Sequence, residues 1–167
     1  MNPAIMATRA TSFSYTLETA LEFYPKHYSE KAGLGFYYDS NNWLFIHITY
    51  SEPLDAPVLT ILQAKLGQRI EFYHNQIPLP VDYEQVKLKI HYHYGIASIY
   101  YSVTTSWEMV LDNLDVTYLS DEGVNGEPGE IGGFTGLFNF IGAVDAYQRT
   151  SYADFHYYKV QEIGLTN

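Results

Sequence analysis

Hydrophobic and polar residues alternate along most of this chain. In the segment 13–23 the apolar side chains share one face, and serine, threonine and glutamate share the other. The apolar face consists of Phe13, Tyr15, Leu17, Leu21 and Phe23. The same period of two runs through residues 86–94, where the apolar face consists of Val86, Leu88, Ile90, Tyr92 and Tyr94. This alternation is typical of β-strands with one face in a core and one face in water.

Further short segments continue the pattern and are separated by turn residues such as the DSNN of 39–42. These segments begin at Gly33, Asn42, Val58, Ser98 and Tyr152. No long helical period competes with them, and the Asp and Asn spacing in 107–122 favours a strand followed by a loop. The sequence therefore predicts an all-β, single-domain antiparallel sandwich over residues 9–162, with short tails at 1–8 and 163–167.

The amino-acid composition limits the classes of partner and the cellular compartment that we expect for this chain. The 167 residues include no cysteine, so no disulfide or thiolate site exists, which fits a reducing, cytoplasmic location. No apolar run is long enough for a signal-peptide core or a membrane helix. With 19 acidic and 9 basic residues, the formal charge is −10, which repels phosphate backbones. We therefore expect neither a nucleic-acid partner nor a membrane.

Aromatic residues form 17% of the chain, and most of them are tyrosines. The β-propensity of tyrosine accounts for most of this excess, but exposed tyrosine and tryptophan rings are also surfaces on which sugar rings stack. The candidate stacking residues are Trp43, Tyr50 and Trp107. For Trp43, which follows the polar residues Asn41 and Asn42, a place in the core is the alternative interpretation.

The segment GGFTGLFNFIGAVDA, residues 132–146, places glycines between phenylalanines. It lacks the strand-to-helix context of a dinucleotide fingerprint and the Gly-Lys-Ser/Thr ending of a P-loop, so nucleotide binding is not favoured. We interpret the glycines at 132, 133, 136 and 142 as parts of an alternating strand, where glycine marks a bulge or a close approach. The preceding segment, 120–133, is rich in glycine and acidic residues and predicts a long loop of the kind that carries function.

Metal binding has two weak candidates. His91 and His93 share a strand face, and with His156 they allow a three-histidine site, but neighbouring lysines disfavour a cation there. Acidic residues also cluster at 112, 115, 121, 122, 127 and 130. Calcium is possible at this cluster, although no EF-hand spacing is present and a solvated acidic loop explains it equally well. We therefore expect no metal and no cofactor.

Hydrolysis of glycosides requires two carboxylates held at a fixed separation. The acidic residues of the strand interiors, Glu18, Glu22 and Asp154, alternate with apolar residues in a way that predicts outward or edge positions instead of a shared cleft. A Gly-x-Ser-x-Gly nucleophile elbow is also absent. The sequence thus predicts no catalytic residues, and unaided hydrolysis is the least favoured function.

The order of motifs is more specific than any single motif. The motifs are FSYTLETALEFYP, KAGLGFYYDSNNWLFIHITYSE, IPLP with VKLKIHYHYG, IYYSVTTSWEMV, LDVTYLSDE, FTGLFNFIGAVD and ADFHYYKV. From about Arg9 to Val160, this series resembles the C-terminal β-sandwich of family 43 glycoside hydrolases, above all the β-xylosidases. The resemblance implies a concanavalin A-like jelly roll that, in full-length enzymes, packs against a five-bladed β-propeller.

In that family the propeller carries the acid, the base and the auxiliary carboxylate that hydrolyse xylosides and arabinosides, so none of these roles transfers to this chain. A phenylalanine of the sandwich helps to close the active site, and the FTG motif makes Phe134 its match. On this view Gly132 and Gly133 permit a sharp turn toward the partner, while Phe138 and Phe140 pack inward. An exposed apolar patch is then expected around Phe134, Phe36 and Tyr37.

Two functions follow from these observations. The first is a non-catalytic accessory domain that docks onto a β-propeller glycosidase domain, with homo-oligomerisation as the other way to cover the same patch. The alternative is an independent carbohydrate-binding module for xylo-oligosaccharides.

Overall fold

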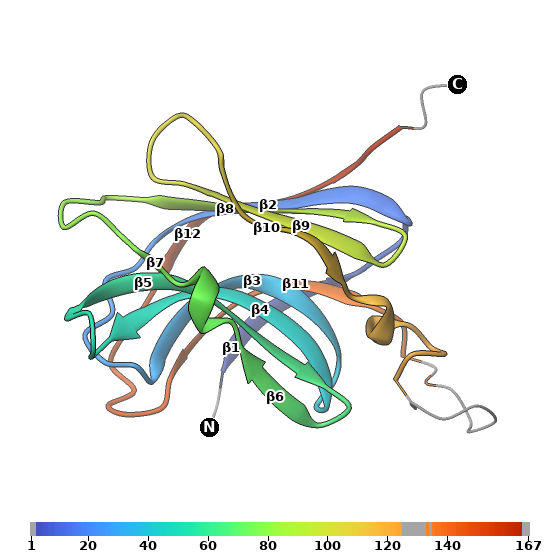
Figure 1. Cartoon of the computed structure of the whole chain (residues 1–167), viewed down its shortest axis with the longest axis horizontal. Helices are drawn as coiled ribbons and strands as arrows, with labels where there is room; N and C mark the ends of the chain where they lie inside the picture. Colours follow the sequence, from blue (N-terminus) through green and yellow to red (C-terminus); the bar gives the residue numbers. More distant parts are fainter. Residues whose placement is uncertain (1–2, 125–132, 134, 165–167) are drawn as a thin grey trace.

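The computed structural model describes residues 3–124, 133 and 135–164, and these form two antiparallel sheets packed face to face (Figure 1). The first sheet contains, in spatial order, β1 (Ala4–Arg9), β11 (Phe138–Asp145), β3 (Glu30–Asp39), β4 (Asn42–Ser51), β5 (Ala56–Lys65) and β6 (Gln68–Glu71), with β7 (Ile77–Pro78) beside β5. The second contains β10 (Glu108–Asp115), β9 (Ile96–Ser102), β8 (Val86–His93), β2 (Ser14–Glu22) and β12 (Asp154–Glu162). The predicted antiparallel sandwich is confirmed.

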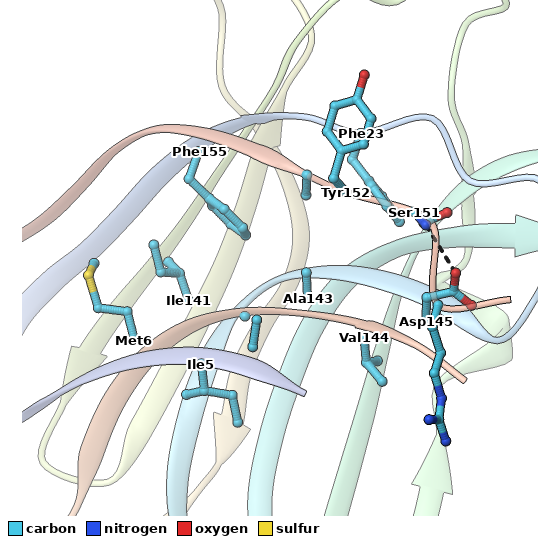
Figure 2. A pocket seen from close by; sticks show the side chains of 14 residues that line it. Ile5, Met6, Phe23, Ile141, Ala143, Val144, Asp145, Ser151, Tyr152 and Phe155 are labelled. Atoms are coloured by element: carbon cyan, nitrogen blue, oxygen red, sulfur yellow. Dashed lines mark hydrogen bonds between the residues drawn. The ribbon is translucent and has the colours of Figure 1, made fainter. Parts of the chain in front are cut away.

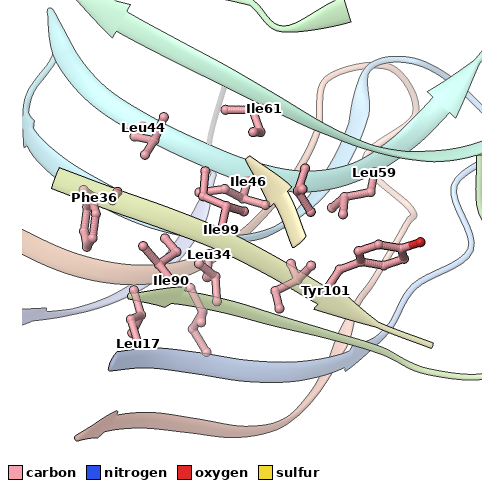
Figure 3. Packing of buried hydrophobic residues seen from close by; sticks show 14 of the residues in the cluster. Leu17, Leu34, Phe36, Leu44, Ile46, Leu59, Ile61, Ile90, Ile99 and Tyr101 are labelled. Carbon is pink, nitrogen blue, oxygen red and sulfur yellow. The ribbon is translucent and has the colours of Figure 1, made fainter. Parts of the chain in front are cut away.

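The core fills the space between the inward faces of the two sheets (Figure 3). Leu34 and Phe36 of β3 lie fully buried opposite Leu17 of β2 and Ile90 of β8. Their alternation with polar or small neighbours places every second side chain of these strands in the core, as the period of two predicted. Burying a Leu or Ile side chain in this layer contributes about 1.5–3 kcal/mol each.

Two predicted core residues are exposed at the turn between β8 and β9. Tyr94 and Gly95 have φ values of +45° and +82°, which is the backbone of a two-residue hairpin turn of the primed type. Tyr94 is therefore exposed, and its ring stacks on that of Phe13 at 5.7 Å. Phe13, at 70% exposure, precedes β2, and its carbonyl accepts the amide of Tyr94 at 2.8 Å. The prediction that these two residues face the core is wrong because both lie beyond the strand ends.

The N-terminal segment departs from the predicted tail. Residues 4–8 belong to β1, which pairs with β11 alone and forms an edge of the seven-stranded sheet. At the other end, β12 finishes at Glu162, where the sandwich was expected to end. Over the described part of the chain, no helix has the length and apolar character needed to cross a membrane.

The glycine-rich segment is also only partly a strand. β11 begins at Phe138, so Gly133 and Gly136 precede it, and Gly136 has a φ of +73°. Gly142 alone among the described glycines of this group lies within the strand, and Gly132 lies outside the described residues. The single alternating strand predicted for these glycines is therefore wrong. The strand followed by a loop in 107–122 is confirmed by β10 and the short helix η2 (Thr117–Leu119).

Candidate docking surface

Strand β1 is exposed along its whole length, although it belongs to the sandwich. Met6 pairs with the core residue Ile141 and so faces the space between the sheets, whereas Ile5 pairs with Gly142 and faces outward. Ile5 is 53% exposed and Met6 is 50% exposed. An edge strand with a bare apolar residue on each face is a template for contact with another surface.

An apolar hollow of about 670 Å³ opens on the inner side of β1 (Figure 2). Its wall is formed by Met6 and Ile141 on one sheet and by Phe155 of β12 on the other, with Phe23 and Tyr152 beside them. The two sheets diverge at this edge, so the side chains that would meet across a closed sandwich face an open cleft. Met6 and Tyr152 are exposed in this hollow, whereas Phe23 and Ile141 at its base are buried.

The loop after β11 forms the rim of the inner hollow. The carboxylate of Asp145 accepts backbone N–H groups from Ser151 (3.1 Å), Tyr147 (2.9 Å), Thr150 (2.9 Å) and Gln148 (3.1 Å). These bonds, above all that from Ser151, lower the pKa of Asp145 to about 2. One ionised side chain therefore organises the turn beside the hollow.

A second apolar hollow, of about 220 Å³, lies on the outer side of β1. Its lining comprises Pro3, Ile5, Tyr37, Trp43, Phe45 and Phe140. The rings of Phe45 and Phe140 lie 5.4 Å apart, on the face of the sheet that points away from the core. We refer to β1 and the two hollows that flank it as the docking surface.

Glycine in β3 permits this arrangement of rings. A Cβ atom at Gly35 would lie 1.9 Å from the carbonyl oxygen of Leu44 and 3.1 Å from the ring of Phe140. Gly35 pairs with Phe140 on one side and with Phe45 on the other. The bare backbone of β3 therefore leaves the space that the two phenylalanines occupy.

The outer rings correct two predictions. Phe140 was expected to pack inward with Phe138, but both pair with outward positions of β3, and the guanidinium of Arg9 lies 5.3 Å from the ring of Phe138. Phe36 was expected in the exposed patch but is fully buried in the core. Only Tyr37 of the predicted patch is both described and exposed. An exposed apolar surface is present, but its residues differ from the predicted ones, because alternation alone does not show which face of a strand meets the core.

Phe134, the predicted active-site lid, lies outside the described residues. The flanking residues do have defined contacts. The amide of Gly133 donates to the carbonyl of Asp121 at 3.1 Å, and the amide of Ala10 donates to the carbonyl of Leu137 at 2.9 Å. The hydroxyl of Tyr38 donates to the carboxylate of Asp121 at 2.5 Å. These bonds attach both sides of the segment to β3 and to the end of β1.

The three candidate stacking residues do not form one platform. Trp43 lines the outer hollow of the seven-stranded sheet, and Tyr50 lies at the opposite end of β4, about 23 Å along an extended strand. Trp107 lies against the outer face of the five-stranded sheet, where the ammonium of Lys89 is 3.7 Å from its ring. Trp43 is half-buried but outside the core.

The histidines and carboxylates of the sequence candidates have other partners. His156 Nε2 lies 2.8 Å from the carboxylate of Glu22, and His91 packs against Tyr100 with ring centroids 5.1 Å apart. Asp112 accepts the hydroxyl of Ser98 at 2.5 Å. Within the described residues no group of three or more His, Cys, Asp or Glu side chains has a geometry that holds a metal ion.

The expected outward position of the strand carboxylates agrees with the structure. Glu18 accepts the hydroxyl of Tyr157 at 2.6 Å on the outer face of the five-stranded sheet, and this contact adds to burial in raising the pKa of that tyrosine. Asp154 is exposed at the start of β12. Among the described residues, we therefore find no cleft that these carboxylates share.

Sequence reasoning missed Ile5, Met6 and Phe45 as members of the surface. The first two were assigned to a tail because AIMATR has no alternation of period two. Phe45 belongs to a strand in which residues 43–46 are all apolar, so the pattern there did not separate an outer from an inner side. The one sequence feature that could have indicated them is the pair of large apolar residues, Ile5 and Met6, in a segment expected to be a tail.

Comparison with known proteins agrees with the fold. A family model described as the β-xylosidase C-terminal concanavalin A-like domain matches residues 1–161. The chain is 29% identical over 163 residues to a β-xylosidase of Bacillus subtilis (strain 168), an alignment that covers 95% of this chain and 29% of that protein. It is 28% identical over 159 residues to a putative β-xylosidase of Escherichia coli (strain K12), with the same two shares.

A solved structure gives the same result in three dimensions. The crystal structure of a xylan β-1,4-xylosidase from Bacillus halodurans C-125 matches with a TM-score of 0.87 and 30% identity, over 96% of this chain and 30% of that one. The chain therefore spans less than a third of the length of each of these relatives.

Proposed function

The chain belongs to the family of C-terminal concanavalin A-like domains of β-xylosidases, and from this premise we propose that it is a non-catalytic accessory domain that docks onto a β-propeller catalytic domain of a family 43 glycoside hydrolase. The observation that carries the proposal is the docking surface, with half-exposed Ile5 and Met6 between two apolar hollows. A surface of this kind is stable in water mainly when a partner covers it.

The position of the N-terminus supports the same surface. In relatives in which this domain is C-terminal, the preceding polypeptide enters at the start of β1. In Figure 1 that end of the chain lies on the outer side of the curved seven-stranded sheet. A partner that is joined there would lie next to β1 and to both hollows, because Ala4 lines the inner hollow and Pro3 lines the outer one.

The role in the hydrolysis of xylosides or arabinosides is indirect in this proposal. The partner supplies the carboxylates, and the sandwich covers an apolar face of the partner and presents the segment that contains Phe134 to its active site. A second copy of this chain is the other partner that would cover the surface.

A chimera tests the proposal. The catalytic portion of the Bacillus halodurans enzyme is joined to this chain in place of its own C-terminal domain, and nitrophenol release from nitrophenyl xyloside and thermal unfolding are measured. We expect the chimera to be active and to unfold in one cooperative transition, because a docked interface couples the two domains. The chain alone is expected to release no nitrophenol.

The control compares two residues of equal exposure. Ile5→Asp places a charge in the docking surface, whereas Met109→Asp places one on the five-stranded sheet, and both side chains are 53% exposed in the structure. Ile5→Asp should split unfolding of the chimera into two transitions, and Met109→Asp should not. Equal behaviour of the two variants, or turnover by the chain alone, refutes the proposal.

A further inference from the structure

A groove of about 710 Å³ lies on the outer face of the seven-stranded sheet, toward the end of β4 that is remote from Trp43. Its principal lining residues are Tyr28, Lys31, Thr49, Tyr50, Glu71 and Tyr73. None of the lining residues belongs to either hollow of the docking surface. The volume is within the range of roughly 300–1,000 Å³ that is usual for small-molecule sites.

Tyrosine rings from three separate segments border this groove. Tyr28 comes from the connection between β2 and β3, Tyr50 from the end of β4, and Tyr73 from the short helix η1 (Tyr73–Asn75). Tyr28 is 56% exposed and Tyr73 is 67% exposed, and the ring of Tyr28 rests on that of His27 at 4.4 Å. Tyr50 is held by a hydrogen bond from its hydroxyl to Asp55. Two largely exposed rings thus flank the space, and their neighbours restrain them.

The floor of the groove is polar and partly buried. Lys31 donates a hydrogen bond from Nζ to the carbonyl of Tyr28, which also accepts the hydroxyl of Thr49 at 3.0 Å. Burial lowers the pKa of Lys31, while the Glu71 carboxylate acts in the opposite direction. The same carboxylate lies beside the hydroxyl of Tyr73 and raises its pKa. An ammonium and a carboxylate therefore both line the groove beside the tyrosine rings.

The chemistry of these groups selects a class of ligand. A sugar ring presents C–H groups that pack on an aromatic face and hydroxyls that donate to a carboxylate and accept from an ammonium. Polyanions are disfavoured because the groove contains Glu52 and Glu71 against Lys31 alone, in a chain with a formal charge of −10. A neutral, polyhydroxylated ligand can pack on the tyrosine rings and form hydrogen bonds with the ammonium and the carboxylate.

We propose that this groove binds a short neutral oligosaccharide, with Tyr28 and Tyr73 as the stacking rings and with Lys31 and Glu71 as the hydrogen-bonding pair. The site is separate from the docking surface, so a sugar in the groove and a partner on β1 do not exclude each other. The inference of an oligosaccharide site comes from the residues that line the groove. Only the choice of a xylose-based probe rests on the proposed function.

The test titrates xylotetraose, up to millimolar concentrations, into the ¹⁵N-labelled chain and follows the amide resonances. We expect shifts at residues that line the groove and a dissociation constant that Tyr73→Ala weakens by about fivefold or more, as expected for loss of a stacked ring. Tyr24→Ala is the matched control, because Tyr24 is also exposed but lines neither the groove nor the docking surface. It should leave the affinity unchanged.

The outcomes separate this inference from the docking proposal. Absence of groove shifts, or binding that Tyr73→Ala leaves intact while the spectrum of the variant shows a native fold, overturns the oligosaccharide site. A cationic peptide that shifts the same resonances when xylotetraose does not also overturns it. In the chimera, Tyr73→Ala should retain the single unfolding transition, so a failure of docking is recorded by a different measurement.

Discussion

His47 is a polar residue enclosed on the outer face of the seven-stranded sheet. Its side chain is buried, its ring stacks on Phe45 at 4.7 Å, and its Nδ1 lies 3.2 Å from the carbonyl oxygen of Phe45. Burial, with a smaller effect from the Lys31 ammonium, lowers the pKa of His47 to about 3. Nε2 has no hydrogen-bond partner among the described residues. The neutral imidazole is therefore the form that the fold accommodates.

This shift predicts a dependence of stability on pH. Between about pH 6.5 and about pH 3 the unfolded chain binds a proton at His47 and the folded chain does not, so the contribution present above pH 6.5 is lost as the pH falls. One such group changes the free energy of unfolding by up to about 1.4 kcal/mol per pH unit. Urea denaturation at several pH values should show a shallower dependence for His47→Gln than for the wild type.

Exposed His74 provides the control for this experiment. His74→Gln should leave the pH dependence of the free energy of unfolding as it is in the wild type. The assignment to His47 is wrong if both variants give the same slope between pH 6.5 and pH 3.

At the scale of the element, β3 combines a core face with an outer face that has two glycines at its centre. Its inner side contributes Leu34 and Phe36 to the core, while Gly33 and Gly35 on the outer side lie against the backbone of β4. Beside these glycines, the neighbouring strands β4 and β11 supply the rings of Phe45 and Phe140. Over residues 33–36, β3 thus presents large side chains to the core and only glycine to the outer face.

Replacement of Gly35 by alanine tests this close approach. The added Cβ would meet the carbonyl oxygen of Leu44 at 1.9 Å, so β3 and β4 must move apart locally. We expect a loss of roughly 1–3 kcal/mol in the free energy of unfolding, typical of overpacking. The measurement is the shift of the urea midpoint. Gly164→Ala, which adds a Cβ with no neighbour within 4 Å, should have little effect; an equal loss in the two variants would contradict the explanation.

The elements that could be predicted from the sequence are those in which alternation and burial coincide. The predicted inner face of β2 from Tyr15 to Leu21 and that of β8 from Val86 to Ile90 are confirmed because each strand has one wet face. β1 was missed because both of its faces are exposed, so no periodic contrast marks it. Phe140 was placed on the wrong face because an aromatic residue on the outer face and one in the core give the same alternation in the sequence.

The presence of an exposed apolar surface could be predicted from the sequence, but most of the residues that form it could not. The resemblance predicted a bare apolar patch, and Tyr37 belongs to it. Phe45 and Ile5, however, join it only through the pairing of β1, β11, β3 and β4, which brings segments from both ends of the chain together. Strand order of this kind follows from tertiary contacts and leaves no local signal in the sequence.

At the scale of the whole molecule, the two sheets have different surroundings. The seven-stranded sheet has the docking surface toward β1 and the tyrosine-lined groove toward the β5 and β7 side. On the outer face of the five-stranded sheet, Glu18 lies opposite Lys89 on one side and opposite Lys159 on the other. The docking surface and the groove therefore lie at opposite ends of the seven-stranded sheet, while the outer face of the five-stranded sheet has charged side chains at its centre.

This asymmetry predicts how the isolated chain behaves in solution. Its formal charge of −10 makes copies repel one another, whereas the bare docking surface attracts them. Salt screens the repulsion, since the Debye length falls from about 30 Å at 0.01 M to about 10 Å at 0.1 M, but it does not weaken the apolar contact. Sedimentation velocity should therefore show self-association that increases with salt.

Two variants test whether the docking surface causes this association. Ile5→Asp should reduce the association, and Met109→Asp, which adds the same charge at the same exposure of 53%, should reduce it less. A chain that stays monomeric at high salt, or one whose association decreases with salt, would show that the edge around β1 is not an adhesive surface.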